Sequence, residues 1–435
     1  MQSNALRSAV TDPLLLTANS AGFCGGIPFA CSQHSEFVNA PKLTWLSGLL
    51  AAALAGTLCG CAHTHGSSPA PEPDRRLAIP HAIQDVKQKY APNKGLRIFD
   101  VGVQRRGLEL VLTGEVDCAE ARIETVRAVE RTGAKVTDRI KVLPDEKLGD
   151  QVWGISCLSV ASGRLLPDHR AELGTQVLMG NVVRVWKPST NAVFRWYLTQ
   201  SADGYLSWLQ KGTFVRCTRE QVDAWNRGPL LMVTAFEDRI LERPDADAQP
   251  VSDVIMCDLV CKTGEEGNWY KVELPDKRAG FLPKKAAADY VTWKQARQPT
   301  AENIERTARR FIGRPYLWGA NSPKGFDCSG FAKIVFFLNG IDLQRDSSKQ
   351  ALEGVAVPLD ADLSQLKKGD LLFFGPRARR GKPERVVHVG IYLGDKLFIH
   401  SSEMVHISSL DPQSPIRDEN RIRTLLHARR ILTGQ

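Results

Sequence analysis

The chain has 435 residues, which is the length of about three average domains. Its composition, with 43% hydrophobic and 24% charged residues, is that of a globular protein and excludes collagen-like, fully disordered and multi-pass membrane classes. Lysine and arginine number 57 against 48 aspartate and glutamate, and this net charge of +9 suits nucleic acid, an anionic membrane surface or an acidic polymer as partner. The 10 cysteines show no paired metal-ligand spacing, so the sequence predicts no metal site.

An apolar segment near the N-terminus indicates the compartment. Residues 43–58 form an apolar run that follows Lys42. Because a transmembrane helix needs about 20 apolar residues, this shorter run is typical of a signal peptide. It ends in Leu58-Cys59-Gly60-Cys61, which resembles the lipobox of bacterial lipoproteins and implies that Cys61 is lipidated. A short membrane anchor and a buried helix are the alternatives.

The residues around this segment are interpreted as a leader and a tether. Because a signal peptide starts a chain, residues 1–37 are expected to be untranslated, with the true start near Val38 or Leu43. We therefore predict a mis-started leader plus a lipoprotein signal peptide over residues 1–61, and a flexible Pro- and Ser-rich tether over residues 62–77. Ala62, where lipoproteins of the inner membrane carry Asp, favours a periplasmic protein anchored in the outer membrane.

The mature chain is predicted to be a multidomain α+β protein with four domains. Residues 78–144 show periodicities in the order helix, strand, strand, helix, strand. This order, with Gly114-Glu115-Val116 closing the second strand, resembles the BON domains of envelope proteins and implies attachment to membrane or wall. A generic α+β packing module is the alternative.

Residues 150–215 and 228–288 consist of short alternating segments with regularly spaced turns, which predicts two small β-barrels. Within the first, residues 171–177 show a helical pattern. Each region ends in an aromatic strand and a Gly-aromatic-Leu hairpin, and both resemble bacterial SH3-like domains, which often target peptidoglycan. Cys257 and Cys261 are expected on one face of a strand as unbridged core thiols.

Residues 299–432 begin with a helix and continue with strands, which predicts an α+β domain. The segment AENIERTARRFIG is an amphipathic helix that Arg314-Pro315 ends. Strands are expected at DLLFFG, HVGIYLG and LFIHSS.

One cysteine and two histidines of this region are candidates for nucleophilic catalysis. Cys328 lies between a turn and an apolar helical run, so it is expected at a helix N-terminus, where the dipole stabilises the thiolate. Asp327 and Ser329 beside it are helix-capping residue types. His388 opens one predicted strand and His400 ends the next, so an antiparallel pair could bring them together as a base and its orienting residue. A buried core cysteine and core histidines are the alternative.

Five motifs in the same region resemble the NlpC family of papain-like cell-wall cysteine peptidases, in the order GRPYLWGA, FDCSGF, GDLLFF, HVGIYLG and IHSS. The resemblance implies Cys328 as nucleophile, His388 as general base and His400 as the third, orienting residue. It implies no metal or organic cofactor. Ala320 stands where the family commonly has a second glycine, and its methyl group is expected to narrow a backbone approach without abolishing activity.

Two SH3-like domains ahead of such a peptidase resemble the subgroup of γ-D-glutamyl-L-diamino acid endopeptidases. In that subgroup the first SH3-like domain closes one end of the cleft, and its acidic residue, with the Asp before the nucleophile, binds the free amine of an N-terminal L-Ala. The resemblance implies these substrate-binding residues: Glu172, Tyr205, Trp318, Asp327, Ser329 and Ser347. A site that offers carboxylates to a buried ammonium rejects N-acylated peptides. A solvent-facing acid is the alternative for Glu172, and a buried strand residue for Tyr205.

These observations predict a lipid-anchored cell-wall endopeptidase that hydrolyses the bond between γ-D-Glu and meso-diaminopimelate or L-Lys in peptidoglycan stem peptides or muropeptides. With a lipobox upstream, nucleic acid is excluded as the partner, and the positive charge is expected to meet anionic envelope polymers or phospholipid. The alternatives are a non-catalytic lipoprotein that binds peptidoglycan or membrane, and an amidase or acyl transferase on the same fold.

Overall fold

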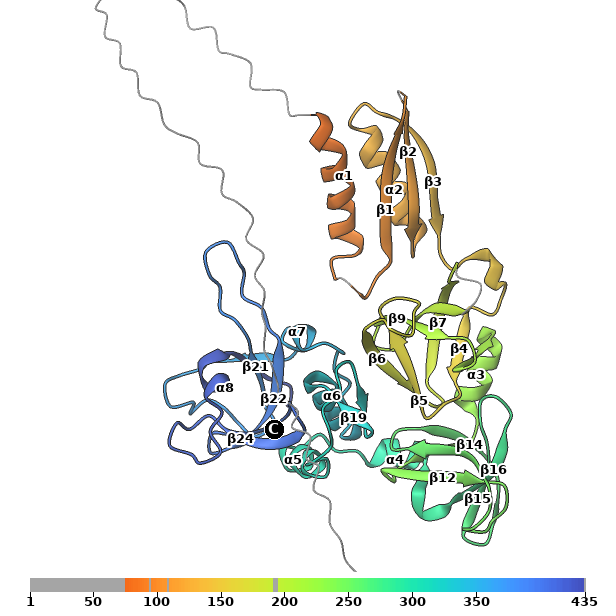
Figure 1. Ribbon diagram of the computed structural model, residues 1–435, viewed down its shortest axis with the longest axis vertical. Helices are drawn as coiled ribbons and strands as arrows, with labels where there is room; N and C mark the ends of the chain where they lie inside the picture. Colours follow the sequence, from red (N-terminus) through yellow and green to blue (C-terminus); the bar gives the residue numbers. More distant parts are fainter. Residues whose placement is uncertain (1–74, 94, 108, 191–194, 434–435) are drawn as a thin grey trace, which may run out of the picture. The chain divides into compact units, whose positions relative to one another are not determined.

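The computed structural model describes residues 75–433, apart from residues 94, 108 and 191–194 (Figure 1). The predicted leader, the signal peptide and Cys61 lie outside the described residues. In the part of the chain that is described, none of the helices is long and apolar enough to cross a membrane.

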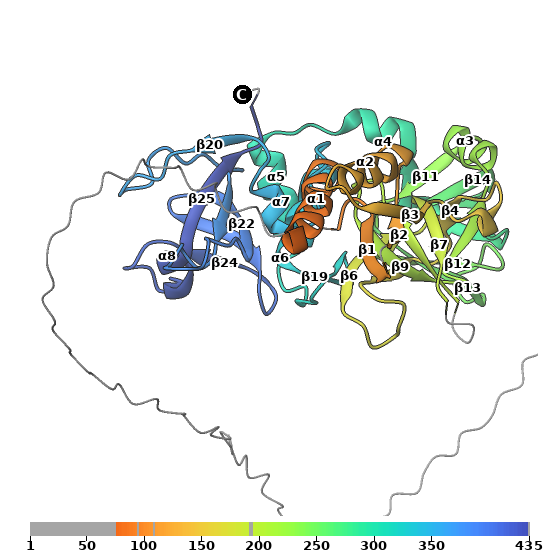
Figure 2. The ribbon, with the colours of Figure 1, turned by 90° about the horizontal axis from the view of Figure 1, so that it is seen from above.

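The first described region has the predicted order of helices and strands. Its elements are α1 (Arg75–Tyr90), β1 (Phe99–Arg106), β2 (Glu109–Val116), α2 (Ala119–Glu130) and β3 (Lys135–Val142). Helix α1 begins inside the predicted tether. Strand β2 pairs antiparallel with β1 and parallel with β3, and both helices pack on one face of this sheet (Figure 2). Gly114 has a φ of +118°, and a Cβ there would lie 1.9 Å from the Asp100 carbonyl oxygen, so this strand end requires glycine. The BON-like assignment stays a prediction.

Two seven-stranded antiparallel sheets follow. After the 3₁₀ helix η1 (Glu146–Leu148), the first contains β4 (Trp153–Ser156), β5 (Val160–Arg164), β6 (Leu173–Leu178), β7 (Val182–Pro188), β8 (Trp196–Gln200), β9 (Leu206–Gln210) and β10 (Phe214–Cys217). Its strand order is β10-β4-β7-β8-β9-β5-β6, and α3 (Arg219–Arg227) follows it in the chain.

The second sheet contains β11 (Leu230–Val233), β12 (Glu237–Leu241), β13 (Pro250–Ile255), β14 (Leu259–Glu266), β15 (Trp269–Glu273), β16 (Ala279–Pro283) and β17 (Ala287–Asp289), with the 3₁₀ helix η2 (Lys284–Ala286) before β17. Its order is β13-β12-β16-β15-β14-β11-β17, and α4 (Tyr290–Ala296) follows it. The strand-rich composition predicted for both regions is present, and the SH3-like assignment stays a prediction.

Two local expectations for these sheets are wrong. The segment predicted as helical, residues 171–177, contributes to strand β6, where pairing with β5 outweighs the local pattern. Cys257 and Cys261 do not share a strand, because Cys257 lies in the β13–β14 turn with a φ of +78° while Cys261 is in β14. The expectation that both are unbridged is confirmed, since all cysteines of the described residues are free thiols.

The C-terminal region is an α+β domain, as predicted. Its elements are α5 (Ala301–Arg309), β18 (Asn321–Ser322), β19 (Gly325–Phe326), α6 (Cys328–Leu338), α7 (Ser347–Gln350), β20 (Val355–Val357), β21 (Leu371–Phe374), β22 (His388–Gly394), β23 (Leu397–Ser401), β24 (Val405–Ser409), α8 (Glu419–Thr424) and β25 (Leu425–Arg430). The sheet order is β20-β25-β21-β22-β23-β24, and α6 packs against β22 and β23. Helix α5 ends at Arg309, before the predicted boundary at Arg314-Pro315.

Candidate active site

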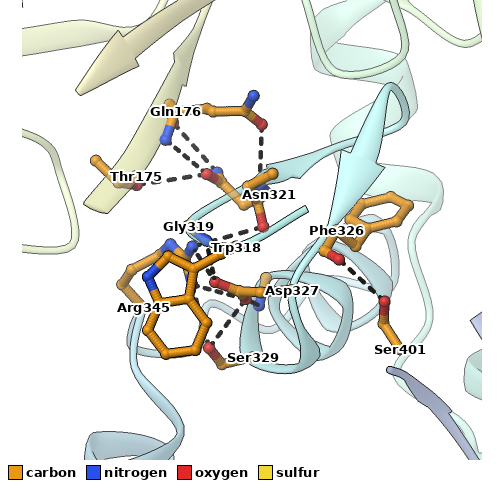
Figure 3. A network of polar contacts seen from close by, with 12 residues as sticks. Thr175, Gln176, Trp318, Gly319, Asn321, Phe326, Asp327, Ser329, Arg345 and Ser401 are labelled. Atoms are coloured by element: carbon orange, nitrogen blue, oxygen red, sulfur yellow. Dashed lines mark hydrogen bonds and ion pairs between the residues drawn. The ribbon is translucent and has the colours of Figure 1, made fainter. Parts of the chain in front are cut away.

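The nucleophile candidate lies at the first position of helix α6. Asp327 is the N-cap, and its Oδ1 accepts a hydrogen bond of 2.7 Å from the Gly330 amide. The helix is anchored by an apolar core that includes Phe331 and Phe336, so its first turn is fixed in place. Strand β19, which precedes this helix, is held by Ser401 of β23, whose hydroxyl donates to the Phe326 carbonyl at 3.0 Å (Figure 3). The predicted position of Cys328 at a helix N-terminus is therefore confirmed.

The two candidate histidines meet across the antiparallel pair β22–β23. His388 Nε2 and His400 Nδ1 are 2.8 Å apart, and His400 Nε2 is 3.0 Å from Ser408 Oγ on β24. Both rings are buried. If His388 Nε2–H donates to His400, then His400 Nε2–H donates to Ser408, and Nδ1 of His388 remains as an acceptor. The predicted pairing of the histidines is confirmed, and this tautomer suits a base.

The thiol of Cys328, on α6, lies against the first residues of strand β22. Cys328 is 7% exposed, and the Val389 and Ser329 backbone amides lie close enough to favour its thiolate form. Val389 is the residue after His388, and α6 packs along this strand. The fold thus brings the thiol to the strand end that carries the imidazole.

Burial decides the charges of this pair. Burial, followed by the charge of Asp327, raises the pKa of Cys328 to about 11. Burial, followed by the charges of Arg421 and His400, lowers the pKa of His388 well below its usual range, and burial lowers the pKa of His400 to about 3. Burial therefore acts against the stabilisation of the thiolate that is expected at a helix N-terminus. Both shifts favour a neutral thiol and a neutral imidazole as the resting pair.

Asp327 is also the centre of a buried ion pair that the sequence analysis missed. Arg345 Nη2 lies 2.6 Å from Asp327 Oδ2, and Nη1 lies 3.0 Å from Oδ1 (Figure 3). The Gly319 amide donates to Oδ2 at 3.0 Å, and the Ser329 hydroxyl lies 3.2 Å from Oδ1. Arg345 is 2% exposed. Both carboxylate oxygens are therefore already engaged, and the charge of Asp327 is compensated.

Reciprocal hydrogen bonds join this domain to the first seven-stranded sheet. Asn321 Oδ1 accepts from the Gln176 amide at 2.8 Å, and Gln176 Oε1 accepts from the Asn321 amide at 3.0 Å (Figure 3). Thr175 Oγ1 also lies 3.4 Å from Asn321 Oδ1. These groups are buried, so they fix β6 against β18.

The predicted substrate residues gather beside this junction. Glu172 Oε1 accepts a hydrogen bond of 2.6 Å from Trp318 Nε1, and the Trp318 side chain is 61% exposed. Burial, followed by the charge of Asp346, raises the pKa of Tyr205 to about 12, with Asp327 and Glu172 also within electrostatic reach. Ser347 follows Asp346 and opens α7, which packs against α6. The structure therefore places residues from both domains around one end of the site.

Ser408 and Gly319 also shape the site, and neither was among the predicted site residues. Ser408 lies in an ordinary strand and carries no motif that would reveal it as the partner of His400. Gly319 has a φ of +77°, and a Cβ at this position would lie 2.0 Å from the Leu173 carbonyl oxygen. Position 319 therefore requires glycine, whereas position 320 accommodates alanine. Ala320 is fully buried, and its carbonyl accepts from the Asp327 amide at 3.0 Å.

The C-terminal domain is similar to known proteins. Residues 313–424 match the NlpC/P60 family. The matched segment contains Cys328, His388, His400 and Ser408. The family match therefore covers the residues of the candidate site.

Named relatives match this chain over stretches of different length. The γ-D-glutamyl-L-lysine dipeptidyl-peptidase of Bacillus cereus is 39% identical over 132 residues, which are 30% of this chain and 38% of the relative. Dipeptidyl-peptidase 6 of Lysinibacillus sphaericus is 27% identical over 273 residues, which are 60% of this chain and 92% of the relative. A crystal structure of an NlpC/P60 family protein from Bacillus cereus is similar with a TM-score of 0.53 at 26% identity, covering 64% of this chain and 99% of that one. The match therefore extends beyond the NlpC/P60 domain.

Proposed function

We propose that the chain is a cysteine endopeptidase that hydrolyses the bond between γ-D-Glu and a diamino acid in peptidoglycan stem peptides with a free N-terminal L-Ala. The observation that supports it best is the buried His388–His400 pair on the strand whose Val389 amide lies against the Cys328 thiol. Glu172, a carboxylate from another domain, accepts a hydrogen bond from Trp318 of this domain. Relatives named as dipeptidyl-peptidases support the reaction class.

The neutral resting pair sets the order of proton transfers. His388 takes the proton of Cys328 as sulfur attacks the γ-carbonyl carbon, and the oxyanion forms near the Cys328 amide at the N-terminus of α6. His388 then gives this proton to the departing amine of the diamino acid, which leaves a thioester. Finally His388 removes a proton from water, hydroxide attacks the thioester, and the thiol is restored. His400 and Ser408 hold the His388 ring throughout.

The pH profile tests this protonation state. A base must be neutral, so its contribution is present above its pKa and is lost as the pH falls through that value. Because the pKa of His388 lies well below its usual range, we expect kcat/KM to stay within about twofold between pH 7.5 and 6.5 and to fall only at lower pH. The substrate amine loses its proton near pH 8, so activity should also fall above that value. An acid limb centred at pH 7 or higher would contradict the neutral pair.

Glu172 is proposed to bind the substrate ammonium. The carboxylate of Asp327 is compensated by Arg345, whereas Glu172 has a neutral indole as its hydrogen-bond partner. We expect wild type to cleave L-Ala-γ-D-Glu-diaminopimelate and to reject its N-acetyl form, and Glu172→Gln to lower kcat/KM for the free amine about 10- to 100-fold. Release of L-Ala-γ-D-Glu by chromatography measures both reactions. Glu237→Gln is the matched control, because Glu237 is an exposed glutamate outside this region.

The outcomes separate the alternatives. Equal cleavage of the free and acetylated peptides would remove the ammonium pocket and leave a peptidase, whereas unchanged discrimination in Glu172→Gln would remove only that residue's role. No turnover of either peptide, together with measurable binding, would favour a non-catalytic wall-binding protein. Transfer of the acyl group to an added amine instead of water would favour an acyl transferase.

Lipid anchoring in the periplasm is also proposed, on the lipobox around Cys61. We expect the full chain to incorporate radiolabelled fatty acid in bacteria and to fractionate with membranes. Cys61→Ala should abolish the label and release the protein, while Cys59→Ala serves as the neighbouring control. Equal labelling of both variants would contradict Cys61 as the lipidated residue.

A further inference from the structure

Arg421 of helix α8 lies beside the catalytic groups. Its guanidinium carbon is 5.7 Å from the centroid of the Phe374 ring, which is itself 5.8 Å from the centroid of the His388 ring. Cys328 and Tyr316 also lie within electrostatic reach of this cation. Arg421 therefore adjoins the site, although none of the motifs of the sequence analysis includes it.

The guanidinium is largely buried, and one of its nitrogens has no partner among the described residues. Its side chain is 16% exposed, and its Nε is buried with no hydrogen-bond partner among the described residues. Asp418 Oδ2 lies 3.8 Å from Nε, which is beyond hydrogen-bond length. Burial lowers the pKa of Arg421, against the smaller opposing effects of Asp418, Cys328, Glu403 and Tyr316. A guanidinium has five N–H donors, so an anionic ligand would satisfy a real deficit here.

The orientation of the bound peptide relative to Cys328 determines which of its groups lies near Arg421. The proposed ammonium pocket, with Glu172 and Trp318, lies on the Asp327 side of Cys328. His388 must reach the nitrogen of the leaving group in order to protonate it. Arg421 adjoins His388 through Phe374, so it lies on the leaving-group side.

We propose that Arg421 binds a carboxylate of the diamino acid that leaves, so that the enzyme prefers a substrate with a free carboxylate in that residue. The inference rests on the proposed peptidase function and specifies its substrate further. A free carboxylate is present at the end of a tripeptide, and meso-diaminopimelate carries one more on its side chain. The chemistry is the same in both cases, namely an anion that accepts charge-assisted hydrogen bonds from a guanidinium.

The test uses the full-length protein and matched peptides. We expect wild type to cleave L-Ala-γ-D-Glu-L-Lys with a kcat/KM about 10- to 100-fold above that of its C-terminal amide. Arg421→Gln should bring this ratio to within about threefold of unity by slowing cleavage of the acid alone, while Arg421→Lys should retain part of the preference. Arg423→Gln is the matched control, because Arg423 is exposed on the same helix and bonds Asn420 at 3.3 Å; its ratio should equal that of wild type.

Additional peptides identify the source of the anion. If the diaminopimelate peptide keeps its preference after C-terminal amidation and loses it in Arg421→Gln, the side-chain carboxylate is the ligand. If Arg421→Gln instead abolishes discrimination between D-Glu and D-isoglutamine, Arg421 binds the other side of the scissile bond and the proposal is wrong. Equal wild-type cleavage of acid and amide would overturn it while leaving the peptidase intact. If no peptide is cleaved, calorimetry on Cys328→Ala decides, since equal affinity for acid and amide would also overturn it.

Discussion

Cys328→Ala is expected to lower kcat for the free-amine peptide by at least about 10⁴-fold while leaving the fold unchanged. The thiol is the atom that becomes bonded to the acyl group, and Ser329 and Asp327 beside it offer no replacement because both side chains are held in the Arg345 network. Substrate should still bind, since the ammonium pocket and Arg421 remain. Steady-state release of L-Ala-γ-D-Glu measures the loss of turnover, and calorimetry measures the retained affinity.

Cys217→Ala is the matched control. Cys217 is a buried free thiol in strand β10, 5% exposed, and burial raises its pKa as it does for Cys328. Its removal should leave kcat within about twofold of wild type. If Cys328→Ala retained more than about 1% of the wild-type rate, the thioester route would be wrong, and a water-activating role for His388 would have to replace it.

The sequence was sufficient for those parts of the site that depend on local structure. A turn followed by an apolar helical run predicted the helix that begins at Cys328. Two consecutive predicted strands, one opened by His388 and the next ended by His400, predicted the pairing of these histidines. Each of these arrangements is set by neighbours in the chain. A helix cap and a tight turn require particular residue types, and these are legible without a structure.

The remaining features arise from contacts between distant segments. Strand β6 replaces the predicted helix because β5 supplies its hydrogen-bond partners. The raised pKa of Cys328 follows from a degree of burial that no local sequence pattern indicates. Arg345 comes close to Asp327 because α7, which follows it in the chain, packs against α6. The sequence does not indicate that Arg345 is buried, and arginine is usually exposed unless it is paired.

Arg345→Met is expected to destabilise the protein by about 3–5 kcal/mol. The substitution removes the cation and leaves the Asp327 carboxylate, 8% exposed, with only neutral donors from Gly319, Gly330 and Ser329. Urea unfolding of the full chain, followed by tryptophan fluorescence, measures the change. Arg306→Met is the control, because Arg306 is exposed on α5 and donates a hydrogen bond to Asn303, so its effect should stay below about 0.5 kcal/mol.

A double-mutant cycle separates the ion pair from packing. Asp327→Asn removes the charge that Arg345 compensates, so the loss of Arg345 should then destabilise the protein less. The decrease in the free energy of unfolding of the double variant should therefore be smaller than the sum of the two single decreases. Purely additive effects would mean that Arg345 acts by filling space. A coupled result has a consequence for recognition as well. An aspartate whose charge is already compensated attracts an ammonium weakly, so Glu172 must provide most of the discrimination between free and acylated peptides.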